Sequence, residues 1–379
     1  MKFLIIASYP SSVLKFRGAL IAALKDKGFE IHIAAPEFNI YPKELNKLEA
    51  LGYKVHDIPM QRTGTNPAAD TKTLLALYRL MRKIKPDYVM GYTIKPVIYG
   101  SLAASLARVP HRFALITGLG YAFQGAEESN YRKPNMQKLM HRLYSVALAT
   151  THKVFFQNPD DEALFKSMKI IKPNLPTKVV NGSGVNTSEY SVVSFPLEDN
   201  VSEPRFLLIA RLLGDKGVRE YAQAAAIVKA KYPQVEFDLV GWIDDNPDSI
   251  EQQELDNWIN DGLLNFIGRL DDVRPAISAC SVYVLPSYRE GTPRTVLEAM
   301  AMGRPVITTD APGCRETVID VYNGYLVPVK AVNELVEAME KFIVDPTLIT
   351  SMGAASRQLV EDKFDVDTVN QVMLAEMGL

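Results

Sequence analysis

Short apolar runs alternate with amphipathic stretches along the first half of the chain. KFLIIAS (2–8) precedes a helical pattern at 14–28, and EIHIAA (30–35) precedes another at 42–51. Similar apolar runs follow at YKVHDI, DYVMGY, RFALIT and KVFFQN. Runs this short that are rich in β-branched and aromatic residues predict strands, and their regular alternation with helices predicts a parallel sheet covered on both faces.

The same alternation restarts after residues 181–204, a stretch rich in Ser, Asn, Pro and Gly that is typical of a linker. PRFLLIAR leads into a helical pattern at 217–231, and the apolar runs VEFDLVG, LNFIG, SVYVLPS, RPVITTD and GYLVPV follow. The sequence therefore predicts an α/β protein with two facing Rossmann-like, doubly wound domains whose ligand loops line the cleft between them. We expect these domains at 1–190 and 191–360, and a C-terminal helix at 361–379 that packs back towards the first domain.

The cysteine content indicates that the protein is found in a reducing compartment. The 379 residues suffice for two cores, and the two cysteines, Cys280 and Cys314, cannot form a disulfide framework or a cysteine-rich zinc site. The opening apolar run is too short for a signal peptide, and no later run approaches the ~18 apolar residues of a spanning helix. We expect a cytoplasmic protein that is soluble or attached to a membrane surface.

Charge divides the chain into halves of opposite sign. The formal net charge is −2, but residues 1–190 hold 26 Lys and Arg against 14 Asp and Glu, whereas residues 191–379 hold 16 against 30. A basic first domain indicates an anionic partner. The alternative is attraction between two oppositely charged domains across their cleft.

The most informative motif is SYREGTPRTVLEAMAMGRPVITTD (287–310), which begins where a predicted strand ends. Thr292 suits the N-cap of the next helix and Pro293 its first position, and the free N–H groups and dipole of such a helix suit a phosphate. Glu290 precedes this helix and Glu298 lies within its first two turns. The two carboxylates can therefore hold sugar hydroxyls on either side of a bound diphosphate, whereas surface ion pairing would explain either one alone.

Two cations lie at the carboxyl end of the first strand in the second half. In ARLLGDKG (210–217), Arg211 and Lys216 lie on a glycine-containing turn that leads into a helix. Both side chains can reach phosphate oxygens, although basic residues in loops are usually solvated. Their position at a strand end favours phosphate binding.

Together these stretches resemble the retaining glycosyltransferases of family 4, which have the two-domain GT-B fold. Glu290 and Glu298 match the family's E-x7-E motif, and Arg211 and Lys216 match its basic pair. With ITGLGYAF and NGYLVPV, the chain is most similar to the branch that builds bacterial capsule, O-antigen and N-glycan precursors on lipid-diphosphate-linked sugars. The resemblance covers essentially the whole chain. It implies that residues 1–190 form an acceptor-binding, membrane-facing domain and that residues 191–360 form the domain that binds the nucleotide sugar.

The resemblance implies a role for each matched residue. Arg211 and Lys216 would bind the donor diphosphate and stabilise the charge that develops as it leaves. Glu290 would contact hydroxyls of the donor sugar. These three residues form the expected catalytic group, and Glu298 would bind the donor through its ribose.

Five further residues complete the expected donor site. Gly291 and Thr292 would offer backbone N–H groups to sugar or phosphate. The loops that contain Gly241 and Arg269 would flank the base, and Gly118 would line the cleft.

The chain departs from the family pattern at two loops. The loop after the first strand, residues 8–12, contains no glycine, and Thr117 stands where many members have a histidine. Close approach of the backbone to the donor phosphate is less favourable without glycine.

The resemblance implies transfer of a hexose or N-acetylhexosamine from a nucleoside diphosphate sugar, preferably UDP-linked, to a polyprenyl-diphosphate-linked saccharide. No protein nucleophile is evident near Glu290, so we expect a front-face displacement with retention of anomeric configuration. Arg211, Lys216 and the helix start can neutralise the diphosphate, so we expect no metal. Neither a resident cofactor nor a nucleic-acid partner is expected.

An anionic membrane surface is the other expected partner, at the inner face of the cell membrane. The helical patterns at 130–149 and 70–85 both combine apolar and basic positions. The basic ones are Arg132, Lys133, Lys138, Arg142, Arg79, Arg82, Lys83 and Lys85. Several such cations near an anionic leaflet, with shallow apolar insertion, can hold a protein on a bilayer. In the alternative, the apolar residues pack on the sheet and the cations are solvated.

Other classes of protein fit less well. Asp365 and Asp367 have the spacing of a metal-binding Asp-x-Asp pair, but their polar segment favours a helix N-cap. The sequence contains no zinc-ligand spacing, and no G-x-G-x-x-G follows the first strand. A nucleotide-sugar epimerase of the same architecture and a non-catalytic, membrane-docked nucleotide-sugar-binding protein are the alternatives.

Overall fold

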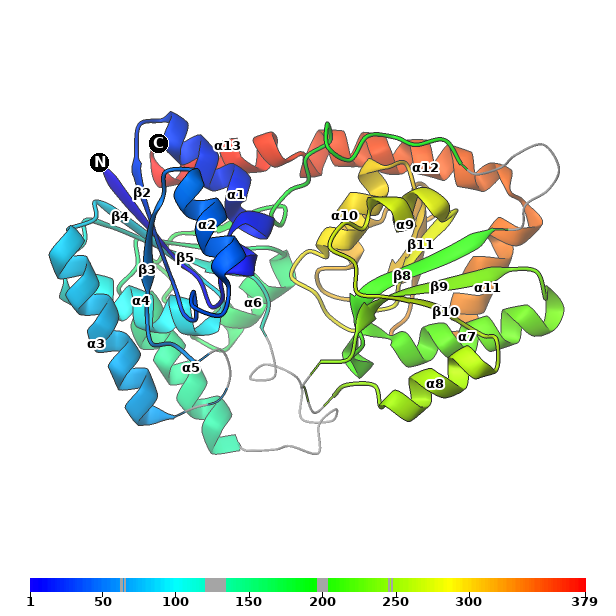
Figure 1. Cartoon of the computed structure of the whole chain (residues 1–379), viewed down its shortest axis with the longest axis horizontal. Helices are drawn as coiled ribbons and strands as arrows, with labels where there is room; N and C mark the ends of the chain where they lie inside the picture. The colour runs from blue at the N-terminus through cyan, green and yellow to red at the C-terminus, as the bar shows by residue number, and fades with distance from the viewer. Residues whose placement is uncertain (62–63, 65, 120–133, 196–203, 245, 247) are drawn as a thin grey trace. The chain divides into compact units, whose positions relative to one another are not determined.

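The chain forms two compact units, each built on one parallel sheet (Figure 1). The computed structural model describes residues 1–61, 64, 66–119, 134–195, 204–244, 246 and 248–379. The first unit comprises Met1–Ser183 with Asn370–Leu379, and the second comprises Gly184–Val369. The predicted α/β fold class is therefore confirmed, and each unit is described by itself.

The sheet of the first unit has seven strands in the order β3-β2-β1-β4-β5-β6-β7, and all neighbours are parallel. Its strands are β1 (Lys2–Ile6), β2 (Glu30–Ala35), β3 (Lys54–Asp57), β4 (Tyr88–Tyr92), β5 (His111–Ile116), β6 (Lys153–Phe156) and β7 (Thr177–Val179). Its helices are α1 (Ser11–Asp26), α2 (Pro42–Ala50), α3 (Pro67–Ile84), α4 (Ile94–Leu106), α5 (Pro134–Leu148) and α6 (Pro159–Ser167). The first six strands confirm the predicted apolar runs, whereas β7 was not predicted.

Successive residues of β1 contribute to cores on opposite faces of this sheet. Phe3 and Ile5 belong to one cluster of buried residues, which also contains residues of α1. Leu4 and Ile6 belong to another, which contains residues of α3. A strand whose two faces are both buried explains the unbroken apolar run at this position.

The sheet of the second unit has six parallel strands in the order β10-β9-β8-β11-β12-β13. Its strands are β8 (Arg205–Arg211), β9 (Glu236–Trp242), β10 (Asn265–Gly268), β11 (Val282–Leu285), β12 (Val306–Thr309) and β13 (Gly324–Val327). The 3-10 helix η2 (Gly214–Lys216) follows β8, and the longer helices are α7 (Val218–Lys231), α8 (Gln252–Asn260), α9 (Arg274–Ala279), α10 (Arg294–Ala301), α11 (Val332–Val344) and α12 (Thr347–Leu359). The strand order reverses direction at β8, between β9 and β11, and such a switch point is where doubly wound sheets bind ligands.

The boundaries between the units differ by a few residues from the expected 190 and 360. Val185 donates its N–H to the carbonyl of Phe364 at 2.9 Å, and Val366 donates to the carbonyl of Val185 at 3.0 Å. Gly184 lies close to the same segment, because a Cβ there would lie 2.6 Å from Val366 Cα. These contacts place 184–190 and 361–369 together in the second unit.

The last helix, α13 (Val366–Met377), begins in the second unit and continues into the first. Its residues Met373, Leu374 and Met377 are buried in the cluster that contains Phe3 and Ile5. Within the described residues, no helix is both long and apolar enough to cross a bilayer.

Candidate functional site

The site lies where β8 and β11 end side by side. The turn after β8 contains Lys216, and the loop after β11 contains Glu290. Two contacts join these loops: Tyr288 donates its N–H to the carbonyl of Asp215 at 2.8 Å, and Ser287 Oγ lies 3.1 Å from the same oxygen. The topology thus brings two motifs together that are 74 residues apart along the chain.

Two glycines allow the loops to approach this closely. Gly217 has a φ of 70°, and a Cβ there would lie 2.1 Å from the carbonyl oxygen of Pro286. Gly313 has a φ of 82°, and a Cβ there would lie 2.1 Å from the carbonyl oxygen of Glu290. Both the positive φ and the close backbone favour glycine. These glycines therefore determine the positions of the loops that contain Lys216 and Glu290.

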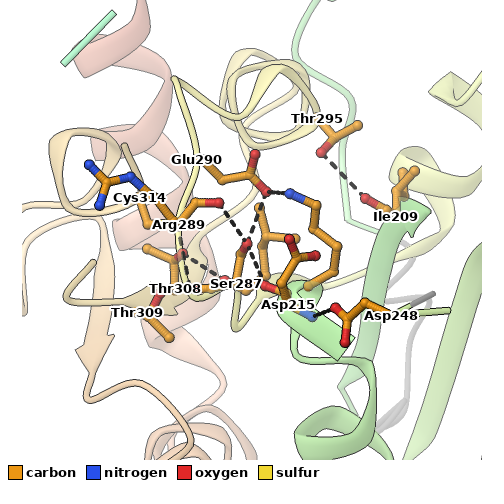
Figure 2. A network of polar contacts seen from close by, with 12 residues as sticks. Ile209, Asp215, Asp248, Ser287, Arg289, Glu290, Thr295, Thr308, Thr309 and Cys314 are labelled. Atoms are coloured by element: carbon orange, nitrogen blue, oxygen red, sulfur yellow. Dashed lines mark hydrogen bonds and ion pairs between the residues drawn. The ribbon is translucent and has the colours of Figure 1, made fainter. Parts of the chain in front are cut away.

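Lys216 and Glu290 form an ion pair at the centre of the site. Lys216 Nζ lies 2.6 Å from Glu290 Oε1, and the side chains are only 15% and 19% exposed. Ser287 Oγ donates to the same carboxylate oxygen at 3.0 Å (Figure 2). Burial lowers the pKa of Lys216, but the negative charges of Glu290 and Asp215 outweigh it, so the pKa lies above its ordinary value. Lys216 is therefore a cation at neutral pH.

Asp215 adds a second carboxyl beside Lys216 that the sequence analysis missed. Its N–H donates to Asp248 Oδ2 at 2.8 Å (Figure 2). Its Oδ1 is buried and has no hydrogen-bond partner within the described part of the chain. Burial raises the pKa of Asp215, and the charge of Lys216 opposes that rise. The motif ARLLGDKG contains Asp215. The burial of Asp215, however, depends on the loop after β9, which only folding brings close to this motif.

Arg211 is the last residue of β8, at the strand end where the sequence placed it. Its Nη1 lies 2.7 Å from Asp244 Oδ2, and its side chain is 38% exposed. Asp244 was not predicted as a site residue, and it lies in an acidic loop after β9. Arg211 and Lys216, the two cations predicted to bind the diphosphate, therefore lie at the ends of the short segment 211–216. Each of them is paired with a carboxylate.

Glu298 is buried within α10, with 2% of the residue exposed. Its Oε1 accepts from Arg294 Nε at 2.7 Å and from the hydroxyl of Tyr190 at 3.0 Å. Burial raises the pKa of Tyr190, and the charge of Glu298 raises it further. The contact of Tyr190 with Glu298 could not be predicted from a local sequence pattern, because the two residues lie 108 positions apart.

The helix start differs from the prediction by one residue. We expected Thr292 at the N-cap and Pro293 at the first helical position, but α10 begins at Arg294 and Pro293 is its N-cap. The carbonyl of Pro293 accepts from Leu297 N at 3.3 Å, which is the first α-helical hydrogen bond, as expected of an N-cap. Thr292 therefore precedes the cap and does not fill it, which is a correction to the expected capping role.

The remaining nominated residues occupy three places. Gly291, which is buried, and Thr292, which is partly exposed, lie in the loop between β11 and α10. Gly241 lies inside β9, where a Cβ would come within 2.0 Å of the carbonyl oxygen of Ala210, so packing alone requires glycine there. Gly118 belongs to the first unit and follows β5 with a φ of 140°. Their donor contacts stay predictions.

Arg269 and Trp242 form a stacked pair at the ends of β10 and β9. The guanidinium carbon of Arg269 lies 4.7 Å from the centre of the Trp242 ring, and Trp242 is 40% exposed. An exposed aromatic face beside a guanidinium can stack on a nucleobase. The base contact of Arg269 stays a prediction.

The acidic pair near the C-terminus acts as a helix start. Asp365 Oδ1 accepts from the N–H of Asp367 at 3.0 Å, and its Oδ2 accepts from Thr187 Oγ1 at 2.8 Å. This contact confirms the N-cap interpretation of Asp365. The described residues include no group of three or more His, Cys, Asp or Glu side chains placed to hold a metal ion.

Comparison with known proteins finds a family match in each half of the chain. Residues 203–345 match the family described as glycosyl transferases group 1, and residues 8–158 match the family described as glycosyl transferase 4-like. The first match contains Arg211, Lys216, Glu290 and Glu298.

Curated relatives extend the match over nearly the whole chain. A Campylobacter jejuni protein named N,N'-diacetylbacillosaminyl-diphospho-undecaprenol alpha-1,3-N-acetylgalactosaminyltransferase is 28% identical over 92% of this chain and 91% of its own length. The Staphylococcus aureus capsular polysaccharide biosynthesis glycosyltransferase CapM is 26% identical over 95% and 92%. An Escherichia coli protein named UDP-Gal:alpha-D-GlcNAc-diphosphoundecaprenol alpha-1,3-galactosyltransferase is 25% identical over 78% and 76%.

Solved structures share the fold. Sucrose-phosphate synthase from Thermosynechococcus elongatus superposes with a TM-score of 0.79 at 20% identity, over 98% of this chain and 97% of that one. Anabaena HepE superposes with a TM-score of 0.77 at 18% identity over the whole of both chains. These likenesses confirm that the two-unit architecture is the GT-B fold.

Proposed function

The chain belongs to the glycosyltransferases, its first half to the 4-like family and its second half to group 1, and we propose that it extends a polyprenyl-diphosphate-linked saccharide. It transfers a hexose or N-acetylhexosamine from a UDP-sugar in the synthesis of a bacterial surface glycan. The observation that carries this proposal is the Lys216–Glu290 pair at the switch point of the second sheet, inside the group 1 match.

The donor contacts follow from the charges at this switch point. Lys216 and Arg211 would bind the diphosphate, because each is a cation near the end of β8. Glu290 would accept hydrogen bonds from the donor sugar. Tyr190 and Arg294 both donate to Oε1 of Glu298, so Oε2 would accept from the ribose hydroxyls.

The names of the relatives support the donor and the acceptor. The E. coli protein is named for UDP-Gal, and both it and the C. jejuni protein are named for saccharides on diphosphoundecaprenol. Both names specify an alpha-1,3 linkage. Formation of such a linkage by this chain from an α-linked donor would retain the anomeric configuration.

Retention here would proceed by front-face displacement. The bond between the anomeric carbon and the leaving phosphate oxygen breaks while the acceptor oxygen bonds to the same face of that carbon. The acceptor's proton passes to the leaving phosphate oxygen, so the products are UDP and the lengthened acceptor. The Glu290 carboxylate is held by Lys216 and Ser287, which favours a binding role over that of a nucleophile.

Charge neutralisation by Lys216 and Arg211 also supports metal-independent transfer. Preorganised cations that face a leaving group stabilise the charge that develops on it. Turnover should therefore persist in EDTA and should not rise when Mg²⁺ is added. Activity abolished by EDTA and restored by Mg²⁺ would contradict this part of the proposal.

The anionic membrane surface is supported by helices α3 and α5 of the first unit. Arg79, Arg82, Lys138 and Arg142 are exposed and have no ion pair among the described residues. On α5, Leu139 and Val146 are 46% and 52% exposed, whereas Tyr144, Ala147 and Leu148 are buried in the core. Part of the apolar face therefore packs on the sheet, and the exposed part can insert into a bilayer. Arg132 and Lys133 lie outside the described residues.

This arrangement would place the enzyme on the inner face of the cell membrane, next to a lipid-linked acceptor. The whole proposal is tested by incubating the protein with UDP-GlcNAc, UDP-GalNAc, UDP-Glc or UDP-Gal and undecaprenyl-diphosphate-linked N-acetylglucosamine. Mass spectrometry should detect release of UDP and an acceptor heavier by one sugar. Conversion of the donor to its epimer without transfer would indicate the epimerase instead, and donor binding without turnover would indicate a binding protein.

A further inference from the structure

The short turn that contains Lys216 has few hydrogen bonds of its own. The 3-10 helix η2 spans three residues and ends at Lys216. Lys216 N donates to the carbonyl of Leu213 at 3.2 Å, and Gly217 N donates to the carbonyl of Gly214 at 3.0 Å. Runs of 3-10 helix stay short because their hydrogen-bond geometry is poor. The position of Lys216 therefore depends on contacts from outside the turn.

Asp248, in the loop after β9, supplies such contacts. Its Oδ2 accepts from Asp215 N at 2.8 Å (Figure 2). Its carbonyl accepts from Gly214 N, also at 2.8 Å. The first N–H groups of a helix have no partner within it, and these two amides belong to η2. Asp248 therefore caps the turn, although it lies 33 residues after Asp215.

The lack of a side chain at Gly214 makes room for the Asp248 carboxylate. A Cβ at Gly214 would lie 2.8 Å from Asp248 Oδ1 and 2.9 Å from Arg219 Nη1. Gly214 is not among the glycines with a positive φ, so its backbone conformation alone does not favour glycine. The close approach of the carboxylate does. The Asp248 side chain therefore lies directly against the turn.

The loop that contains Asp248 is itself held along the end of β8. Ile250 N donates to the carbonyl of Leu212 at 2.9 Å, and Ser249 Oγ donates to the same oxygen at 3.1 Å. Leu212 N in turn donates to the carbonyl of Trp242, the last residue of β9, at 3.0 Å. Both sides of the loop are thus hydrogen-bonded to the strand end that leads into η2, which fixes the direction from which Asp248 approaches.

The peptide groups of Asp215 are held from two loops. The loop after β9 accepts its N–H through Asp248, and the loop after β11 donates to its carbonyl through Tyr288 N at 2.8 Å. Lys216 follows directly and pairs with Glu290 on the β11 side. Without Asp248, only the β11 side would hold the turn.

We propose that Asp248 is a positioning residue for glycosyl transfer. It determines the place of the Lys216 ammonium by accepting from the two amides of η2, and it acts on the donor only through Lys216. Its contribution is geometric, because an accepting oxygen and not a negative charge makes each contact. This assignment rests on the proposed binding of the donor diphosphate by Lys216.

Two substitutions in the full chain separate position from charge, with kcat measured as release of UDP in the presence of acceptor. Asp248→Ala should lower kcat about tenfold or more, because a displacement of about 1 Å can cost roughly 10²-fold in rate. Asp248→Asn keeps an oxygen that can accept from Asp215 N and should stay close to wild type. An equal loss in both variants, or no loss in either, would overturn the assignment.

A double variant tests whether Asp248 acts through Lys216. Asp248→Ala should change kcat by less than about twofold when Lys216→Ala is already present, because residues that act as a unit are not additive. A merely structural role would lower kcat by the same factor in both backgrounds. That additivity would overturn the assignment.

Glu254→Ala is the matched control in the same unit. Glu254 is a carboxylate of α8 that accepts from Arg219 at 2.8 Å and from Glu251 N at 3.2 Å, not from η2. Its loss should lower the midpoint of thermal unfolding and leave kcat unchanged. A loss of kcat equal to that of Asp248→Ala would overturn the assignment, because general destabilisation would then explain both.

Failure of the proposed transfer is measured separately, by calorimetric binding of UDP to the same variants. If the wild-type protein transfers nothing, Asp248→Ala should still weaken UDP binding in the presence of Lys216 and not in its absence. Equal weakening in both backgrounds would overturn the positioning role alone. UDP affinity unchanged by Lys216→Ala would overturn the proposed diphosphate role of Lys216, and the positioning role with it.

Discussion

At the residue scale, the two groups assigned to the diphosphate and to the donor sugar are paired with each other. Lys216 Nζ lies 2.6 Å from Glu290 Oε1. An ammonium has three N–H donors, so Lys216 can bind a phosphate oxygen and still keep Glu290. The ion pair would then couple the position of the cation that stabilises the leaving group to that of the carboxylate that holds the sugar.

Lys216→Ala should lower kcat steeply, by ~10²–10³, because it removes a preorganised charge from the leaving group. Turnover is measured by release of UDP from the donor in the presence of acceptor. Lys229→Ala is the control, since Lys229 is a partly exposed lysine of α7 in the same unit, away from the site. Equal turnover in both variants would contradict the assigned role.

The same substitution leaves the partly buried Glu290 without its cation, which also destabilises the fold. The double variant Lys216→Ala/Glu290→Gln removes that unpaired charge. It should recover thermal stability but not turnover. Recovery of turnover together with stability would mean that the pair is structural.

At the scale of elements, the contact between the β8 and β11 loops depends on the backbone of Gly217. Alanine there would meet the Pro286 carbonyl at 2.1 Å and would also adopt a φ of 70°. Gly262 provides the matched control, because its φ is 66° but nothing lies within 4 Å of an added Cβ. The left-handed conformation costs an L-residue roughly 1–2 kcal/mol.

Gly217→Ala should therefore lower the midpoint of thermal unfolding clearly more than Gly262→Ala. A loss of 1 kcal/mol corresponds to a shift of roughly 2–4 °C in a unit of this size. We expect a shift of about that order for Gly262→Ala and at least twice that shift for Gly217→Ala, with reduced donor affinity only in the latter. Equal shifts would mean that the loops can separate without cost.

A histidine pair on β2 and β3 predicts how stability varies with pH. His32 Nδ1 lies 2.8 Å from His56 Nε2, and Glu30 Oε1 lies 2.7 Å from His32 Nε2. Burial and, to a smaller extent, the charges of His32, Lys83 and Lys54 together lower the pKa of His56 to about 4. Burial also lowers the pKa of His32, although Glu30 opposes that shift.

The unfolded chain therefore binds more protons than the folded chain between pH 6.5, the ordinary histidine value, and about 4. The free energy of unfolding should fall as the pH falls through that window and should be unaffected by this pair above it. Urea unfolding at several pH values should show a shallower fall for His56→Gln than for wild type. His111→Gln, at an exposed histidine of the same unit, is the control, and an unchanged slope in His56→Gln would contradict the assignment.

The sequence predicted most elements and the nominated motifs, but not the contacts that join them. Twelve apolar runs became strands because buried parallel strands need nearly continuous apolar residues. β7 was missed because its three residues, Thr177–Val179, are too few to show a pattern. The start of α10 was predicted one residue too early, because in the sequence Thr292-Pro293 either residue can be the N-cap. Tyr190 and Asp248 were missed because their site contacts cross long stretches of chain.

At the scale of the whole molecule, the two units carry net charges of opposite sign. The basic first unit carries exposed cations on α3 and α5, and α5 also carries the exposed apolar residues Leu139 and Val146. Each Lys or Arg near an anionic leaflet contributes about 1 kcal/mol, and salt screens this attraction. Binding should therefore depend on both lipid charge and salt.

Lys138→Glu/Arg142→Glu should release the protein from anionic liposomes, as measured by co-sedimentation at low salt. Lys47→Glu/Lys172→Glu makes the same change of charge at exposed lysines of the same unit outside α3 and α5, and it should retain more binding. Binding of UDP should be unchanged in both. Liposome binding that does not vary with lipid charge or salt would remove the physical support for membrane docking.

Retaining transfer to a polyprenyl-diphosphate-linked saccharide is tested most directly by the anomeric configuration of the transferred sugar. Wild-type protein, an α-linked UDP-sugar and the lipid-linked acceptor are incubated in EDTA, and the product is analysed by ¹H NMR. We expect an acceptor lengthened by one sugar in α linkage, with UDP as the other product. A β-linked product, or donor consumed without any lengthened acceptor, would contradict it.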